Sequence, residues 1–289
     1  MEDGKEKIAM KTVFTLKSAE SRRLIAKAVV AMPEFQTAWK SAYVLLAGGT
    51  TNAFIAQELL GREGIEPAHC TVGLSTNGLL CVTHPDSRKS FPNVFYKGVA
   101  QDKTLPDALS DFHPETVVIK GANAVDPEGN VGVVTAGFDG GTIPRIIGPV
   151  TSKGLKYITP VGLEKLVPSV KAAAAAVGAT HIDIPMGADF GMYCIANTTV
   201  VTEIEALRIL FGLKGTLVCC GGVGGNEGAV TIAAEGEEQQ VRALVEFLEK
   251  EIKGEPPVAG NKGLCHECRY KNCRYNGLTP DQIPAWMKD

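Results

Sequence analysis

The residues best suited to metal chemistry are three cysteines near the C-terminus, Cys265, Cys268 and Cys273. Thiolates at this C-x2-C-x4-C spacing suit a tetrahedral zinc ion or one face of a [4Fe–4S] cluster. His266, a residue from elsewhere in the chain or a substrate would complete the ligand set. Because the tail is too short and polar to hold a core of its own, either metal would help to fold it. The sequence predicts an iron-sulfur cluster or zinc here, and the count of three cysteines favours iron-sulfur.

A loop of small residues is the second candidate site. It comprises Gly48, Gly49, Thr50, Thr51 and Asn52, and it follows the apolar run YVLL, which predicts a buried strand. The apolar residues after it recur at helical spacing, so the loop would place backbone N–H groups and two hydroxyls at a helix N-terminus and favour an anion. It lacks the spacing of a Walker or dinucleotide loop, which argues against ATP and NAD. The alternative is a tight turn in which a threonine caps the helix.

A third candidate region is the segment KGANAVDPEGN, residues 120–130, which follows the β-branched run TVVI. The carboxyl end of a strand in an open α/β sheet is where such folds place their ligands. Lys120, Gly121 and Asn123 are therefore candidate ligand-binding residues, and Asp126 and Glu128 are candidate acids or bases. The simpler interpretation of the two acidic residues is that they form a turn.

These two loops carry a family resemblance. The segments AGGTTNAFIAQEL and IKGANAVDPEGN resemble motifs of the superfamily that contains ribose-5-phosphate isomerase, glucosamine-6-phosphate deaminase, the coenzyme A transferases and the initiation-factor-2B-like sugar isomerases. The resemblance covers about residues 42–167. It implies an α/β fold with a mostly parallel, Rossmann-like sheet, in which residues 48–52 hold a phosphate or an acyl carrier and Lys120 neutralises an anion.

The chain also departs from that family. Asn123 stands where the sugar isomerases carry a functional aspartate, and the signature DGADE is missing, which argues against ribose-5-phosphate isomerase activity itself. Because an amide is not a base, proton abstraction would need Asp126, Glu128 or Glu164. The resemblance therefore implies a sugar-phosphate isomerase-like enzyme that acts on a small phosphorylated or anionic metabolite.

Two other functions remain open. The segments GTIPRI and GLEKLVP are similar to lactate-utilisation proteins, which have the same core and are associated with iron-sulfur chains, so a redox-linked component with a protein partner is one alternative. A coenzyme A transferase-like protein is the other. It would need a glutamate nucleophile in an open glycine-flanked loop. Glu227 in GGVGGNEGA has such neighbours, but its position between two strand-like runs favours a hairpin.

The pattern of elements divides the chain into four parts. Residues 1–41 should form N-terminal helices, residues 42–179 the Rossmann-like α/β core, residues 180–254 a smaller α+β layer, and residues 255–289 the cysteine-rich tail. Residues 161–177, which include an alanine run, are expected to be helical with a break at Pro168. The glycine- and proline-rich residues 140–154 are expected to be irregular.

Composition limits the partners. The chain has 289 residues and a formal net charge of -3, which argues against nucleic acid. No apolar run is long enough to span a membrane, and the start MEDGKEKIAMK lacks the apolar segment of a signal peptide. We therefore expect a cytoplasmic protein, with reduced thiols, that forms a homo-oligomer. Five cysteines in or beside apolar runs are expected to be buried: Cys70, Cys81, Cys194, Cys219 and Cys220.

Overall fold

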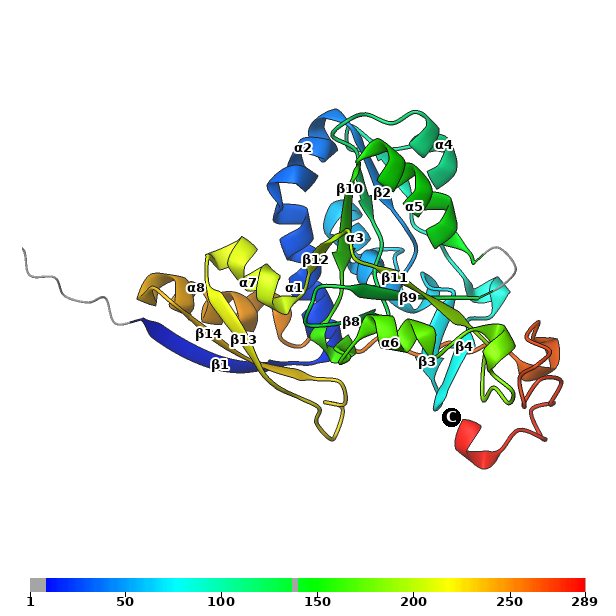
Figure 1. Ribbon diagram of the computed structural model, residues 1–289. Coiled ribbons are helices and arrows are strands. Elements are labelled where there is room, and N and C mark those ends of the chain that lie inside the picture. Colours follow the sequence, from blue (N-terminus) through cyan, green and yellow to red (C-terminus); the bar gives the residue numbers. More distant parts are fainter. Residues whose placement is uncertain (1–8, 137–139, 289) are drawn as a thin grey trace, which may run out of the picture.

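A mixed sheet of six strands lies at the centre of the computed structural model, which describes residues 9–136 and 140–288 (Figure 1). Its order is β12-β10-β7-β2-β5-β6. The first four strands are parallel, whereas β5 pairs antiparallel with β2, and β6 pairs antiparallel with β5 at the edge. The strands are β2 (Tyr43–Leu46), β5 (Val94–Tyr96), β6 (Val99–Ala100), β7 (Val117–Ile119), β10 (Lys156–Pro160) and β12 (Thr199–Val201). The sheet is thus partly parallel.

Helices cover both faces of this sheet because its strands are apolar on both sides. In β2, Val44 and Leu46 pack against one group of helices, and Tyr43 and Leu45 pack against the other. The first group is α1 (Ser18–Ala31), α2 (Pro33–Ser41) and α3 (Thr50–Leu60), and the second is α4 (Leu105–Ser110) and α5 (Thr142–Lys153). The continuous apolar run YVLL therefore indicated a strand that is buried on both faces.

A smaller layer lies beside the central sheet (left in Figure 1). It is an antiparallel sheet of order β1-β14-β13, with α7 (Glu203–Phe211) and α8 (Glu238–Phe247) packed on it. The strands are β1 (Met10–Leu16), β13 (Lys214–Cys220) and β14 (Val230–Gly236). The two helices and two strands of this layer from residue 203 onward agree with the pattern of the sequence, whereas β1 was not predicted. Since β1 pairs with β14 along its whole length, the N-terminal segment belongs partly to this layer.

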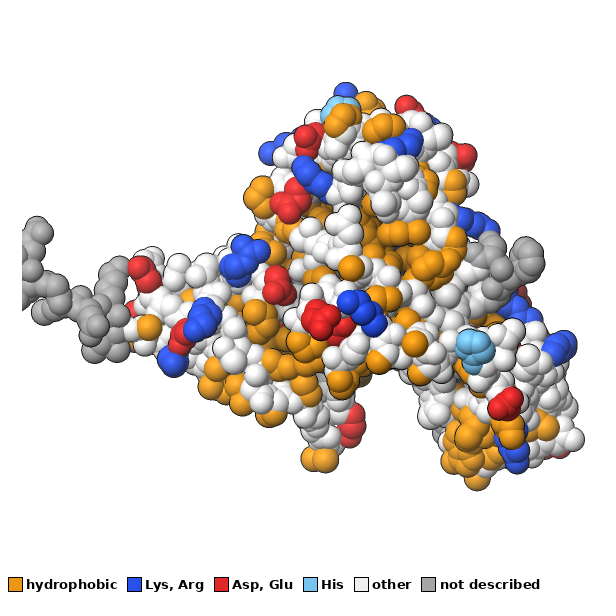
Figure 2. Space-filling view, in the orientation of Figure 1, with side chains coloured by type: hydrophobic (Ala, Val, Ile, Leu, Met, Phe, Trp, Pro, Cys, Tyr) orange, Lys and Arg blue, Asp and Glu red, His pale blue; other side chains and the backbone are white. Residues whose placement is uncertain are grey.

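The remaining elements join the central sheet to the tail. An antiparallel sheet of order β11-β9-β8 runs across one end, and the separate hairpin β3–β4 carries the C-terminal tail (Figure 1). These elements are β3 (Gly73–Thr76), β4 (Leu79–Val82), β8 (Ala124–Val125), β9 (Val131–Thr135), α6 (Val170–Ala175) and β11 (Gly191–Ile195). In Figure 2 the hairpin and tail form a lobe that stands out from the rest of the molecule at lower right.

Two expectations about helices differ from the structure, the first only in part. Residues 161–177 do break near Pro168 and continue in the short helix α6. Before the break, however, there is only a 3-10 turn, Leu163–Lys165, followed by extended chain in which Val167 N–H donates to Val125 O. Residues 142–153 form α5 although Pro149 lies inside it. The buried side chains of Ile143, Ile146 and Val150 explain that helix, because packing them on the sheet offsets the cost of a proline.

Among the helices that the structure describes, none combines the length and the apolar composition needed to cross a membrane.

Candidate functional site

The loop between β2 and α3 lies at the carboxyl edge of the parallel strands. Gly49 is the N-cap residue of α3, with φ at 149°, and its N–H donates to Cys70 O at 2.9 Å. The expected alternative, a threonine cap, is therefore not what the helix uses. The first helical hydrogen bond runs from Ala53 N–H to Gly49 O. The N–H groups of the first turn before Ala53 are those that a helix leaves for other acceptors.

Asn52 holds this edge together. Its side chain is fully buried, and its Nδ2 donates to Ala47 O at 2.6 Å and to Ile119 O at 3.2 Å, so it links the ends of β2 and β7. Its Oδ1 has no hydrogen-bond partner among the described residues, and it lies beside Gly121, where a Cβ atom would be 3.9 Å away. Asn52 thus leaves a buried acceptor at the point where the two candidate loops meet.

Lys120 brings the second loop against the first. It follows the last residue of β7, and its Nζ lies 3.4 Å from Gly48 O. The side chain is half-buried, and burial lowers the pKa of its ammonium group to about 8. Lys120 therefore faces the loop of residues 48–52 at this edge of the sheet.

A second lysine, Lys165, lies at the same edge and was not singled out from the sequence. It ends the 3-10 turn after β10, and its Nζ donates to Ala122 O at 3.1 Å. Burial is the largest cause that lowers its pKa to about 8, and the positive charges of Arg22 and Lys120 lower it further. In the part of the chain that the structure describes, no carboxylate forms an ion pair with Lys120 or Lys165. The two ammonium groups therefore repel each other next to the glycine loop.

Two carboxylates lie beside Lys165, and each raises its pKa. Glu164 pairs with Arg22 at 2.8 Å, and both side chains are largely buried. Glu203 is the first residue of α7 and is fully buried; its Oε2 accepts a hydrogen bond from Leu163 N–H at 2.9 Å. Burial raises the pKa of Glu203. The nearby Ser21 hydroxyl and the Leu163 N–H lower it, but by less, so the pKa of Glu203 is raised overall. A carboxyl group with a raised pKa is suited to proton transfer near neutral pH.

The other predicted acids lie in different surroundings. Asp126 is buried in the turn between β8 and β9, where it accepts hydrogen bonds from Glu128 N–H, Asn130 N–H and side-chain amide, and Val170 N–H. Burial alone would raise its pKa, but these donors together lower it. A carboxylate held in this way is a weak base. The side chain of Glu128 is 74% exposed and lies 3.8 Å from Lys171.

Asn123, which is exposed, has a structural partner: its Oδ1 accepts a hydrogen bond from Val134 N–H at 3.0 Å.

Glu227 is exposed in the loop between β13 and β14, as a hairpin residue should be. The end of that glycine-rich loop borders the site, because a Cβ atom on Gly228 would lie 3.3 Å from Glu164 Oε2. The small layer therefore forms one side of the edge that carries the lysines.

The three C-terminal cysteines line one cavity in the tail, of about 270 Å³. Within residues 9–136 and 140–288, no group of three or more His, Cys, Asp or Glu side chains is arranged to hold a metal ion. The expectation of five buried cysteines was wrong, since Cys70 and Cys81 are only half-buried and the other three are exposed. Cys194, Cys219 and Cys220 are exposed, because they lie on strands with one open face, and Cys81 lines the tail cavity.

Three residues at these sites were missed in the sequence: Lys165, Glu203 and Cys81. Lys165 and Glu203 each follow an apolar run that becomes a parallel strand, β10 and β12, so position after a strand was the available signal. Cys81 lies inside a short apolar run, and nothing local distinguishes it from a core cysteine.

No protein-family model matches the sequence. No curated protein matches it either. A solved structure of D-ribose-5-phosphate isomerase in complex with phospho-erythronic acid is similar to this chain with a TM-score of 0.27 and 17% identity, over 80% of this chain and 85% of the other. A TM-score of this size does not establish a shared fold.

Proposed function

We propose that the protein is an enzyme that binds a small phosphorylated or otherwise anionic metabolite at the carboxyl edge of the parallel strands. The observation that carries this proposal is the pair Lys120 and Lys165, whose ammonium groups lie at the ends of adjacent strands without a carboxylate partner among the described residues. Repulsion between these two partly buried ammonium groups destabilises the protein when no ligand is bound. A bound anion would relieve that repulsion and gain hydrogen bonds to charged donors.

The glycine loop supports the same ligand class. The first turn of α3 presents backbone N–H groups on the side of the sheet where Lys120 reaches Gly48 O. The lysines and a helix N-terminus thus supply the two kinds of donor that phosphate groups bind. A ligand with one phosphate group would lie between residues 48–52 and the two ammonium groups.

Isomerisation through an enediolate is the chemistry that this set of groups supports best. A base removes the proton from the hydroxyl-bearing carbon next to a carbonyl group, and the hydroxyl proton moves to the carbonyl oxygen. The base then returns its proton to the former carbonyl carbon, so atoms and electrons balance without a cofactor. Glu164 and Glu203 flank Lys165, and the raised pKa of Glu203 makes it the better proton carrier. The ammonium groups would stabilise the negative charge that develops on the oxygens.

A ligand screen tests the binding step. The full chain is screened by thermal shift against inorganic phosphate and a panel of sugar phosphates, and affinities of hits are measured by calorimetry. We expect Lys120→Met and Lys165→Met each to weaken binding roughly tenfold to a hundredfold, since a hydrogen bond to a charged group contributes about 1.5–3 kcal/mol.

Lys40→Met is the matched control, because Lys40 is exposed near the end of α2, just before β2 begins and so at the opposite end of the strand. It should bind like the wild type. Unchanged affinity in both site variants would refute the proposed site. Binding without turnover of any bound sugar phosphate would refute the isomerase chemistry alone.

A further inference from the structure

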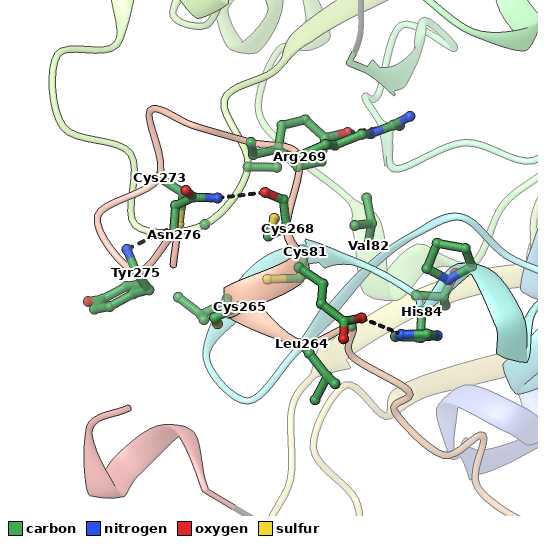
Figure 3. Close-up of a pocket in the computed structure, with 18 of the residues that line it drawn as sticks. Cys81, Val82, His84, Leu264, Cys265, Cys268, Arg269, Cys273, Tyr275 and Asn276 are labelled. Carbon is green, nitrogen blue, oxygen red and sulfur yellow. Dashed lines mark hydrogen bonds and ion pairs between the residues drawn. The ribbon is translucent and has the colours of Figure 1, made fainter. Parts of the chain in front are cut away.

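The tail cavity brings four cysteines together, one more than the C-terminal motif contains. Cys265, Cys268 and Cys273 line it from the tail, and Cys81 lines it from β4, nearly two hundred residues earlier in the chain. Figure 3 shows the four labelled cysteines around one space, with the hairpin on one side and the tail on the other.

Backbone contacts fix the tail against the hairpin at this point. Gly263 N–H donates to Val82 O at 2.9 Å, and Thr83 pairs with Lys262 in an antiparallel bridge. Within the tail, Gly277 N–H donates to Cys265 O at 2.9 Å, which closes the segment that carries the three cysteines into a loop. The position of Cys81 relative to the tail is therefore set by main-chain hydrogen bonds on both sides of the cavity.

The candidate fourth ligand named by the sequence, His266, does not compete with Cys81. The lining of the cavity does not include His266, whose Nε2 instead lies 3.4 Å from Glu267 Oε1. His84 does line the cavity, but its Nε2 is 3.0 Å from Glu267 Oε2. Cys81 is thus the residue that completes a set of four thiols.

The size of the space favours a cluster over a single ion. A structural zinc ion holds four sulfur atoms at about 2.3 Å, so its site closes around the metal. Here the four cysteines line a cavity of about 270 Å³, which is far more space than a single ion occupies. An iron-sulfur cluster places iron and sulfide between the four thiolates and so needs such a space.

Positive charge and hydrogen-bond donors surround the thiols. Lys262 Nζ lies 3.9 Å from Cys265 Sγ, and Tyr275 N–H donates to Cys273 Sγ at 3.4 Å. Arg88 and Arg269 also line the cavity. Four thiolates around an iron-sulfur core carry net negative charge, and such donors to the sulfur atoms stabilise it.

We propose that Cys81, Cys265, Cys268 and Cys273 together bind an iron-sulfur cluster that fastens the tail to the β3–β4 hairpin. Besides the main-chain hydrogen bonds, only a small hydrophobic core, with Leu79, Tyr275 and Met287 as its buried members, packs this lobe together among the described residues. The cluster would supply the cross-link that so small a core lacks. This site is separate from the lysine edge, so either proposal stands if the other fails.

Anaerobic purification of the full chain tests the proposal. We expect a broad visible absorbance that bleaches on reduction, with iron and sulfide in equal amounts of two or four per chain. Cys81→Ser should lose the absorbance, the iron and the sulfide. Cys194→Ser is the matched control, because Cys194 is exposed on β11 outside the cavity, and it should keep all three.

Differential alkylation of the wild type keeps the test valid if Cys81→Ser does not fold. In the metal-loaded protein Cys194, Cys219 and Cys220 should react, while the four cavity cysteines should be protected until the cluster is removed by oxidation and chelation. The proposal is overturned if the protein holds zinc without sulfide, if Cys81→Ser keeps wild-type iron and sulfide, or if Cys81 reacts as fast as Cys194 while the three tail cysteines stay protected.

Discussion

The ammonium group of Lys120 lies 3.4 Å from the carbonyl oxygen of Gly48, which joins the end of β7 to the loop that follows β2. A carbonyl is a weaker partner than a carboxylate, so the lysine stays available to an anion. Lys165 repeats the arrangement one strand away, with Ala122 O at 3.1 Å. The two strands β7 and β10 are neighbours in the sheet, and this is why residues 45 positions apart lie at the same edge.

The first prediction concerns pH. Because Lys120 and Lys165 have pKa values of about 8, anion binding should weaken as pH rises above 8, not above 10. Sulfate is the suitable probe, since its charge is constant in this range. We expect its affinity to fall roughly tenfold or more between pH 7 and 9.5, measured by calorimetry at fixed ionic strength. An affinity that stays flat up to pH 10 would show that neither lysine has a lowered pKa.

This edge of the sheet is the part of the molecule that the sequence predicted best. The run YVLL and the loop after it were placed correctly, because a strand buried on both faces and a helix that follows it leave strong local patterns. The contact of Lys120 with Gly48 is explained by the rule that parallel strands end at one edge of the sheet. Such features depend on short stretches of chain.

The features that the sequence did not predict depend on distant partners. The strand β1 is stabilised by pairing with β14 more than two hundred residues later, and α5 by burying Ile146 on the sheet despite Pro149. Cys81 lies in a short apolar run, as a core cysteine does. Only the tail that folds over it brings it to the cavity that the other three cysteines line. Local propensity contains no information on these contacts.

A second prediction compares the two glycines of the loop. At Gly49, φ is 149°, a conformation that is strained for any other residue, whereas Gly48 has an ordinary φ and a Cβ atom there would lie 3.4 Å from Cys70 O. Gly49→Ala should lower the free energy of unfolding by about 1–3 kcal/mol, and it should weaken phosphate binding by displacing the first turn of α3. Gly48→Ala should cost less than about 1 kcal/mol. Urea denaturation measures both, and equal costs would contradict the argument.

A third prediction concerns the buried cation of α1. Arg23 is fully buried, with Nη1 2.6 Å from Glu58 Oε1 of α3 and Nε 2.9 Å from Glu255 Oε2 of the segment that leads to the tail. Arg23→Met leaves Glu255, which is also buried, without that charge, although Arg62 still lies 3.0 Å away. We expect a loss of about 3–5 kcal/mol in the free energy of unfolding.

Arg242→Met is the control for Arg23→Met. Arg242 pairs with Glu238 on the exposed side of α8, with a side chain that is 69% exposed, so the variant should change stability by less than about 1 kcal/mol. If both variants lose the same stability in urea denaturation, the burial of Arg23 has no energetic consequence.

The last prediction concerns Glu203, whose burial raises its pKa above 4.5. Between 4.5 and the raised value, the folded protein keeps the proton while the unfolded chain releases it. Glu203 therefore stabilises the fold at low pH, and that contribution is lost as pH rises through the folded pKa. The glutamine side chain of Glu203→Gln stays neutral at every pH and can still accept the hydrogen bond from Leu163 N–H. The free energy of unfolding of this variant, relative to that of the wild type, should therefore increase from pH 5 to 8. Glu63→Gln, an exposed control, should show no such trend. The same Glu203→Gln variant should lose most of its turnover while it keeps phosphate affinity, because it retains both lysines but lacks the carboxyl group with the raised pKa. A variant that gains no relative stability at pH 8 would show that Glu203 is ionised at little cost, and it would remove the physical reason for assigning the proton transfer to this residue.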